Sequence, residues 1–206
     1  MNPTLARLAN ALNNSQLLSL WENGFVESLQ EQFNKRGDLS PRQLEILERI
    51  EKQKLSEEAR QADSTWKSNY DAEKRRIARI CAEYYKSAGY FTNLAESILE
   101  VPDYIPAEKA WRKMCENKYA KKVIANHDAP VKYEVGSLVA FRATADWAHR
   151  VAAGDKPCVV ISAGGPILHA AKGSKPYMVL PYSANKPIEC QERHIKKYKK
   201  SKKTKK

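Results

Sequence analysis

Apolar side chains recur at helical spacing through the first 127 residues of the chain. Every three or four positions a large one returns to the same side, which is typical of amphipathic helices. The first such stripe predicts a helix from about Ser15 and consists of Leu18, Trp21, Phe25, Leu29 and Phe33. Further stripes predict helices that begin at Pro41 and cover about 63–88, 92–100 and 106–126. The pattern therefore predicts an all-α region of about five or six helices.

Capping signals mark several of these helix boundaries. Ser40 precedes Pro41 and stands three residues before Gln43, which is the arrangement of a capping box at a helix start. Gly37 and Gly89 are placed to end the preceding helices, because glycine enters the left-handed backbone conformation at little cost. We therefore expect one helix to end at Gly37 and another at Gly89.

Beyond His127–Pro130 the pattern changes to short runs of β-branched and aromatic residues separated by turn residues. The expected strands are Val131–Glu134 with Gly136–Arg142, Pro157–Ser162, Ile167–His169, Tyr177–Leu180 and Pro187–Cys190. Residues 143–156 are expected to form a loop, and Glu192–Ile195 a closing helical turn or a short strand. Such strands are too short and too few for a sandwich and predict a small, curled barrel.

Four segments of this region resemble an SH3-like barrel of the kind found in KOW domains and at the C-terminus of retroviral integrases. They are VGSLVAFR (135–142), KPCVVIS (156–162), YMVLP (177–181) and ERHIKKY (192–198). The resemblance implies a module that binds nucleic acid or protein. The connection at 143–156 is longer than is usual in that family.

A segment of the helical half, WENGFVESLQEQFNKRGDLSPRQLEILERIEKQ (21–53), resembles a helical module that recurs in bacteriophage proteins. The resemblance implies a phage origin. The cytoplasm, and for a phage protein the host cytoplasm, is then the expected location.

These patterns together predict an α+β protein in three parts. Residues 1–127 are expected to form a helical domain, residues 131–195 an SH3-like β-barrel, and residues 196–206 a disordered basic tail. The tail has too many charges and too few apolar residues to fold alone.

Composition narrows the classes of function. No apolar run approaches the ~18 residues that a membrane span needs, and the N-terminus lacks a signal-peptide pattern. The 4 cysteines form no C-x-x-C pair, and the 4 histidines show neither H-x-x-x-H nor H-E-x-x-H spacing. We therefore expect no membrane partner, no metal, no cofactor and no enzymatic activity.

Positive charge is concentrated in the last third of the chain. Residues 1–130 hold 20 Lys and Arg against 19 Asp and Glu, whereas residues 131–206 hold 16 against 5. Such an asymmetry is typical of a region that meets a polyanion, since lysines that neutralise phosphates release condensed counterions. The candidate nucleic-acid contacts are Arg142, Arg150, Lys156, Lys172, Lys175, Arg193, Lys196, Lys197, Tyr198, Lys199, Lys200, Lys202 and Lys203.

The helical half offers a second, weaker candidate surface. Lys74, Arg75, Arg76 and Arg79 form a basic strip beside the aromatic residues at 84–85 and 90–91. Phosphate contact and base stacking are one interpretation of this strip; a solvated face over buried aromatic residues is the other.

The sequence therefore predicts a non-enzymatic accessory or regulatory protein that binds nucleic acid, with DNA favoured over RNA, largely without sequence preference. The helical domain would bind a second protein or self-associate. Two alternatives stay open: a protein-interaction factor that targets host polymerase or defence machinery, and an RNA- or ribosome-binding protein.

Overall fold

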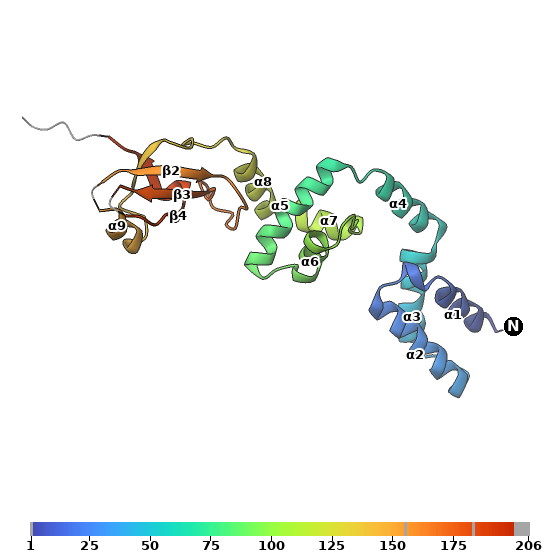
Figure 1. Ribbon diagram of the computed structural model, residues 1–206. Coiled ribbons are helices and arrows are strands. Elements are labelled where there is room, and N and C mark those ends of the chain that lie inside the picture. Colours follow the sequence, from blue (N-terminus) through green and yellow to red (C-terminus); the bar gives the residue numbers. More distant parts are fainter. Residues whose placement is uncertain (1, 155, 183, 200–206) are drawn as a thin grey trace, which may run out of the picture. The chain divides into compact units, whose positions relative to one another are not determined.

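The computed structural model describes residues 2–154, 156–182 and 184–199 (Figure 1). Helices occupy residues 3–128 and a five-stranded antiparallel sheet follows, so the α+β prediction is confirmed. The chain divides into two compact units, Met1–Asn69 and Tyr70–Lys206. The helices are thus shared between both units, whereas the sequence pattern placed its boundary near residues 127–131.

The first unit is entirely helical. Its elements are α1 (Pro3–Asn13), η1 (Ser15–Leu17), α2 (Leu20–Arg36), α3 (Pro41–Ile50), the π-helical turn η2 (Glu51–Leu55) and α4 (Glu57–Ser68). Leu8, Val26, Leu29 and Leu47 are almost fully buried at its core, together with smaller contributions from neighbouring apolar residues. The apolar stripe of α2 therefore buries its middle against α1 and α3.

Both capping predictions in this unit are confirmed. The Ser40 hydroxyl accepts from the Gln43 backbone N–H, and the Gln43 side chain accepts from the Ser40 N–H at 3.0 Å. Gly37 ends α2 at φ 80°, in the left-handed region, and its N–H donates to the Phe33 carbonyl. Because these bonds are local, the sequence alone locates this turn.

The second unit begins with four helices: α5 (Ala72–Ala88), α6 (Thr92–Glu100), α7 (Glu108–Cys115) and α8 (Lys118–Asp128). The helix predicted over 63–88 is wrong, because α4 ends at Ser68 and α5 begins only at Ala72. Asp71 causes the break: its side chain accepts from the Lys74 N–H and caps a new helix. Gly89 ends α5 as expected, at φ 73°.

The helix predicted over 106–126 is also divided in two. Glu116 ends α7, and the Asn117 side chain accepts from the backbone N–H groups of Tyr119 and Ala120, which starts α8. Aspartate and asparagine are strong N-caps, so each of these interruptions has a local chemical cause.

The sheet follows the helices. Its strands are β1 (Leu138–Phe141), β2 (Cys158–Ala163), β3 (Pro176–Pro181), β4 (Ile188–Gln191) and β5 (Ile195–Lys197). They lie in the order β4-β3-β2-β1-β5 with antiparallel neighbours throughout, and the 3₁₀ turn η3 (Glu192–His194) immediately precedes β5. Val139, Cys158, Val160, Val179 and Ile195 form the buried face.

Three details of the sheet region differ from the sequence prediction. Val131–Glu134 and Ile167–His169 are not strands. The expected loop at 143–156 contains a helix, α9 (Trp147–Ala153), which Asp146 caps through the Ala148 N–H at 2.8 Å. Lys196 and Lys197, assigned to the tail from the sequence, belong to β5.

Within the described residues, no helix combines the length and apolar character of a membrane span.

Candidate nucleic-acid interface

The loop between β2 and β3 attaches the sheet to the helices of the same unit. Ile167 is 1% exposed and packs with Ile80 of α5 and Val123 of α8. The Asn126 amide donates to the Ala171 carbonyl at 2.8 Å and lies 3.2 Å from the Ser174 hydroxyl. This explains why Ile167–His169 is not a strand: its apolar residue is used against the helices.

Lys175 belongs to this junction and not to a surface. Its side chain is buried, and the ammonium donates to the His127 carbonyl at 3.0 Å and to the Ala129 carbonyl. These carbonyls lie at the end of α8, where backbone acceptors lack helical partners and attract positive charge. Lys175 therefore caps α8, and its assignment as a nucleic-acid contact is corrected.

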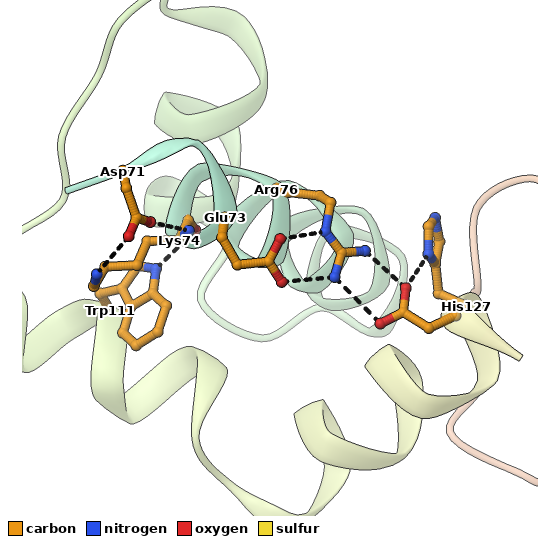
Figure 2. A network of polar contacts seen from close by, with 7 residues as sticks. Asp71, Glu73, Lys74, Arg76, Trp111 and His127 are labelled. Atoms are coloured by element: carbon orange, nitrogen blue, oxygen red, sulfur yellow. Dashed lines mark hydrogen bonds and ion pairs between the residues drawn. The ribbon is translucent and has the colours of Figure 1, made fainter.

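A charged network, shown in Figure 2, also contacts the end of α8. Arg76 of α5 donates to both carboxylate oxygens of Glu73 at 2.8 Å and to Asp128 at 2.7 and 3.2 Å. His127 lies 3.0 Å from the same Asp128 carboxylate. The Arg76 guanidinium lowers the pKa of Asp128 to about 2, with a smaller contribution from His127.

The basic strip of α5 is largely committed to such pairs. Lys74 lies 3.1 Å from Asp71, and Arg75 lies 3.1 Å from Asp103. Of the strip, only Arg79 is exposed with no described carboxylate in ion-pair range. The solvated, internally paired interpretation of this strip is thus the one that the contacts favour.

The aromatic residues beside the strip are mostly covered. Tyr85 is buried, and its hydroxyl donates to the Asn117 side chain at 2.9 Å. Tyr84 and Phe91 are half-buried and pack edge-on against the Tyr85 ring. Tyr90, at 67% exposure, is the exception.

The described cations of the sheet region differ from those of α5, because no described carboxylate lies in ion-pair range of them. Every ion pair found among the described residues lies within residues 7–128. The candidate contacts that are exposed and unpaired, as far as the described part of the chain shows, are Arg150, Lys156, Lys172, Arg193, Lys196, Lys197 and Lys199.

Two of these cations, Lys172 and Arg193, are brought together where the turn η3 after β4 contacts the loop between β2 and β3. The Arg193 N–H donates to the Gly173 carbonyl at 2.9 Å, and this places Lys172 beside Arg193. Lys196 of β5 lies opposite Ala140 of β1. It follows the buried Ile195, and successive side chains of a strand point to opposite faces, so Lys196 points to the outer face. Lys172 and Arg193, which are distant in sequence, thus lie close together.

Arg142 has a structural role at this surface. Its side chain is half-buried, and Nε donates to the Ile195 carbonyl at 2.8 Å, while its backbone N–H donates to the His194 carbonyl. Arg142 therefore fixes the start of β5, on which Lys196 and Lys197 lie.

Tyr198 is half-buried, and its N–H donates to the Leu138 carbonyl at 3.0 Å. The pairing of β5 continues to this residue, so packing against the sheet is the interpretation that the contacts support. Lys200, Lys202 and Lys203 lie outside the described residues.

The sequence interpretation missed two groups of exposed residues. Lys118, Lys121 and Lys122 lie on one side of α8 with no carboxylate in ion-pair range within the described chain. Trp147, 69% exposed, and Val151, 58% exposed, lie on α9. The spacing of four residues between Trp147 and Val151 was the sequence signal for an exposed apolar face. It was overlooked because residues 143–156 were expected to form a loop.

No metal centre is found in the part of the chain that the structure describes. It contains no group of three or more His, Cys, Asp and Glu side chains able to hold a metal ion. All four cysteines are buried free thiols, and burial raises the pKa of Cys190 to about 12. Comparisons with protein-family models, curated proteins and solved structures each found no match.

Proposed function

We propose that this protein binds nucleic acid, with DNA favoured, through the phosphate backbone and without enzymatic action. The observation that carries the proposal is the set of exposed cations between Arg150 and Lys199 that have no described carboxylate in ion-pair range. A cation without a carboxylate neighbour keeps its full field for an incoming polyanion, whereas an ion-paired one is already partly neutralised. The lysines of residues 200–206 add further charge in sequence.

Affinity of this kind comes from counterion release and depends steeply on salt. Arg150, Arg193 and Lys196 lie on a short helix, a 3₁₀ turn and an edge strand, and not on one helix that fits a groove. Backbone contact without base readout is therefore the mode that we propose.

We further propose that the sheet is an SH3-like barrel. The order β4-β3-β2-β1-β5 and the 3₁₀ turn directly before β5 support this assignment. The position of α9 between β1 and β2 is a departure, because this connection is usually a loop in that family.

A second function, protein interaction, is favoured by one feature of the first unit. Leu20 is 92% exposed and Trp21 is 60% exposed at the start of α2. Exposed large apolar residues side by side are typical of binding surfaces for proteins. We propose that this surface binds a protein partner or a second copy, in addition to or instead of the nucleic-acid contact.

The test is a salt titration of duplex DNA binding by the full chain and by a variant with Arg150, Lys156, Lys196 and Lys197 changed to glutamine. Each lost phosphate contact lowers the slope of log K against log salt by about 0.9, so we expect a decrease of up to ~4. An RNA duplex is titrated in the same way to compare it with DNA. A chain that ends at Lys199 is titrated as well, since this truncation keeps β5 intact.

The matched control changes four paired cations of α5, α7 and η2, namely Lys52, Arg75, Lys86 and Arg112, to glutamine. It removes the same formal charge, but we expect a much smaller change of slope. Equal slopes for the two variants, or no binding of the parent to any nucleic acid in dilute buffer, would contradict the proposal.

A further inference from the structure

Helix α9 presents an apolar face to solvent. Trp147 and Val151 are four residues apart and lie on the same side, with Arg150 beside them. The opposite side packs inward: Ala153 is buried in the sheet core, and the His149 ring lies 5.7 Å from the Phe141 ring. Docking of the helix on the sheet therefore leaves Trp147 outside.

Trp147 differs from the other tryptophans in its surroundings. Trp66 and Trp111 are 7% exposed, and the exposed Trp21 stacks on Phe25 with ring centroids 5.3 Å apart. Trp147 is 69% exposed, and no ring contact to it is found among the described residues. A large flat apolar side chain is thus available to a ligand.

Helix α9 connects the end of β1 to the start of β2, which are antiparallel, so the exposed residues at this end of the sheet indicate what kind of ligand would fit. Arg150 follows on the same helix, and Lys156 lies at the entrance to β2, both exposed and without a described carboxylate partner. Tyr182, 63% exposed, lies beside Lys156, because its N–H donates to the Pro157 carbonyl at 3.0 Å. Among the described residues the acidic neighbour is Asp146, whose side chain accepts from the Ala148 N–H and caps α9.

We infer that this surface, formed by Trp147, Arg150, Lys156 and Tyr182, binds single-stranded nucleic acid by stacking an unpaired base on the Trp147 ring. The inference rests on the proposed function and names its substrate class. In a duplex the base faces are already covered by their neighbours, whereas in a single strand they are free to stack on an aromatic side chain. The cations at the same surface then hold the adjacent phosphates.

The test compares an oligo-dT strand with a DNA duplex of equal length, each labelled for fluorescence anisotropy, using the full chain at fixed salt. Trp147→Ala is expected to weaken oligo-dT binding about 10-fold, within the range for loss of one stacked base, and to change duplex binding less than about 2-fold. Trp21→Ala, which also removes an exposed indole, is expected to change neither. An oligo-U arm tests RNA in the same way.

Two further variants separate stacking from general apolar contact and from misfolding. Trp147→Phe keeps an aromatic face and is expected to retain most of the affinity for oligo-dT, whereas Trp147→Leu keeps apolar volume and is expected to behave like alanine. Circular dichroism melting of all variants is expected to match the parent, because the side chain is exposed.

The outcomes are distinguishable. Binding of neither strand nor duplex by the parent contradicts the proposed function and this inference together. Equal binding of both by the parent, with no selective effect of Trp147→Ala, overturns the inference and leaves the proposed function intact. Full affinity of Trp147→Leu also overturns it, since a protein-like apolar contact would then explain the surface.

Discussion

The helices of residues 70–128 and the sheet region of residues 131–199 each hold 11 Lys and Arg, yet they use them differently. In the helices, five of these cations are ion-paired: Lys74, Arg75, Arg76, Lys86 and Arg112. In the sheet region none of the described cations lies in ion-pair range of a described carboxylate. The first segment has 9 Asp and Glu and the second has 5, so both the number and the placement of carboxylates separate the two.

The difference follows from the geometry of the two kinds of element. A helix places residues three and four apart side by side, so Glu108 and Glu116 both reach Arg112 from within one helical stretch. Neighbouring residues of a strand point to opposite faces, and a cross-strand partner must come from elsewhere in the chain. The helices therefore neutralise part of their charge locally, whereas the described cations of the sheet region have no described carboxylate in ion-pair range.

Lys175 is buried, unlike the exposed cations of the sheet region, and replacing it gives the largest expected effect. In Lys175→Met the packing volume is largely kept, but the carbonyls of His127 and Ala129 lose a charged donor. We expect a loss of about 2–3 kcal/mol in the free energy of unfolding, measured by urea denaturation. Affinity for DNA is expected to stay within about 2-fold.

Lys172→Met is the matched control, because Lys172 is an exposed lysine three residues away in the same connection. We expect the opposite outcome: unchanged stability and a smaller salt slope. If both variants lose stability equally, the distinction between a capping lysine and a ligand-facing lysine is wrong.

Arg142→Gln is expected to have an intermediate effect. The Nε–H donates to the Ile195 carbonyl and holds the start of β5, so we expect a loss of about 1 kcal/mol in urea denaturation. DNA affinity should fall less than in Lys196→Gln, which removes an exposed cation without touching a hydrogen bond of the fold. A larger loss of affinity in Arg142→Gln would place its guanidinium at the phosphates.

Local chemistry was predictable from the sequence, and long-range contacts were not. The capping box at Ser40 and the helix end at Gly37 depend on residues within four positions, and both are confirmed. The breaks at Asp71 and Asn117 are equally local, but the apolar stripes on either side continue in phase and concealed them.

The errors in the sheet region have a different cause. Ile167 has the apolar character of a strand residue, yet it packs on Ile80 and Val123, which are more than 40 positions away. Lys175 carries the positive charge expected of a phosphate contact, but its ammonium donates instead to a backbone carbonyl at the end of α8. The spacing of apolar and polar residues within one helix or strand does not indicate these long-range contacts, because they depend on how the helices and strands pack together.

His194 offers the smallest and most selective test of the sheet region. Burial lowers its pKa below the ordinary 6.5, and Arg193 and His149 act in the same direction, opposed by Asp146. Its Nδ1 lies 3.4 Å from the Gln191 backbone N–H, a contact that requires the unprotonated nitrogen as acceptor. The fold therefore favours neutral His194.

Because the pKa is lower in the folded chain than in the unfolded chain, the stabilising contribution is complete above about pH 6.5 and is lost as pH falls through the folded value. We expect the free energy of unfolding to decrease between pH 7.5 and 5, and His194→Gln to reduce that dependence. His169→Gln, at an exposed histidine, is the control. A pH dependence that is identical in all three proteins would assign the acid sensitivity to another group. DNA affinity should not fall over the same range while the chain stays folded, since protonation adds positive charge to the protein.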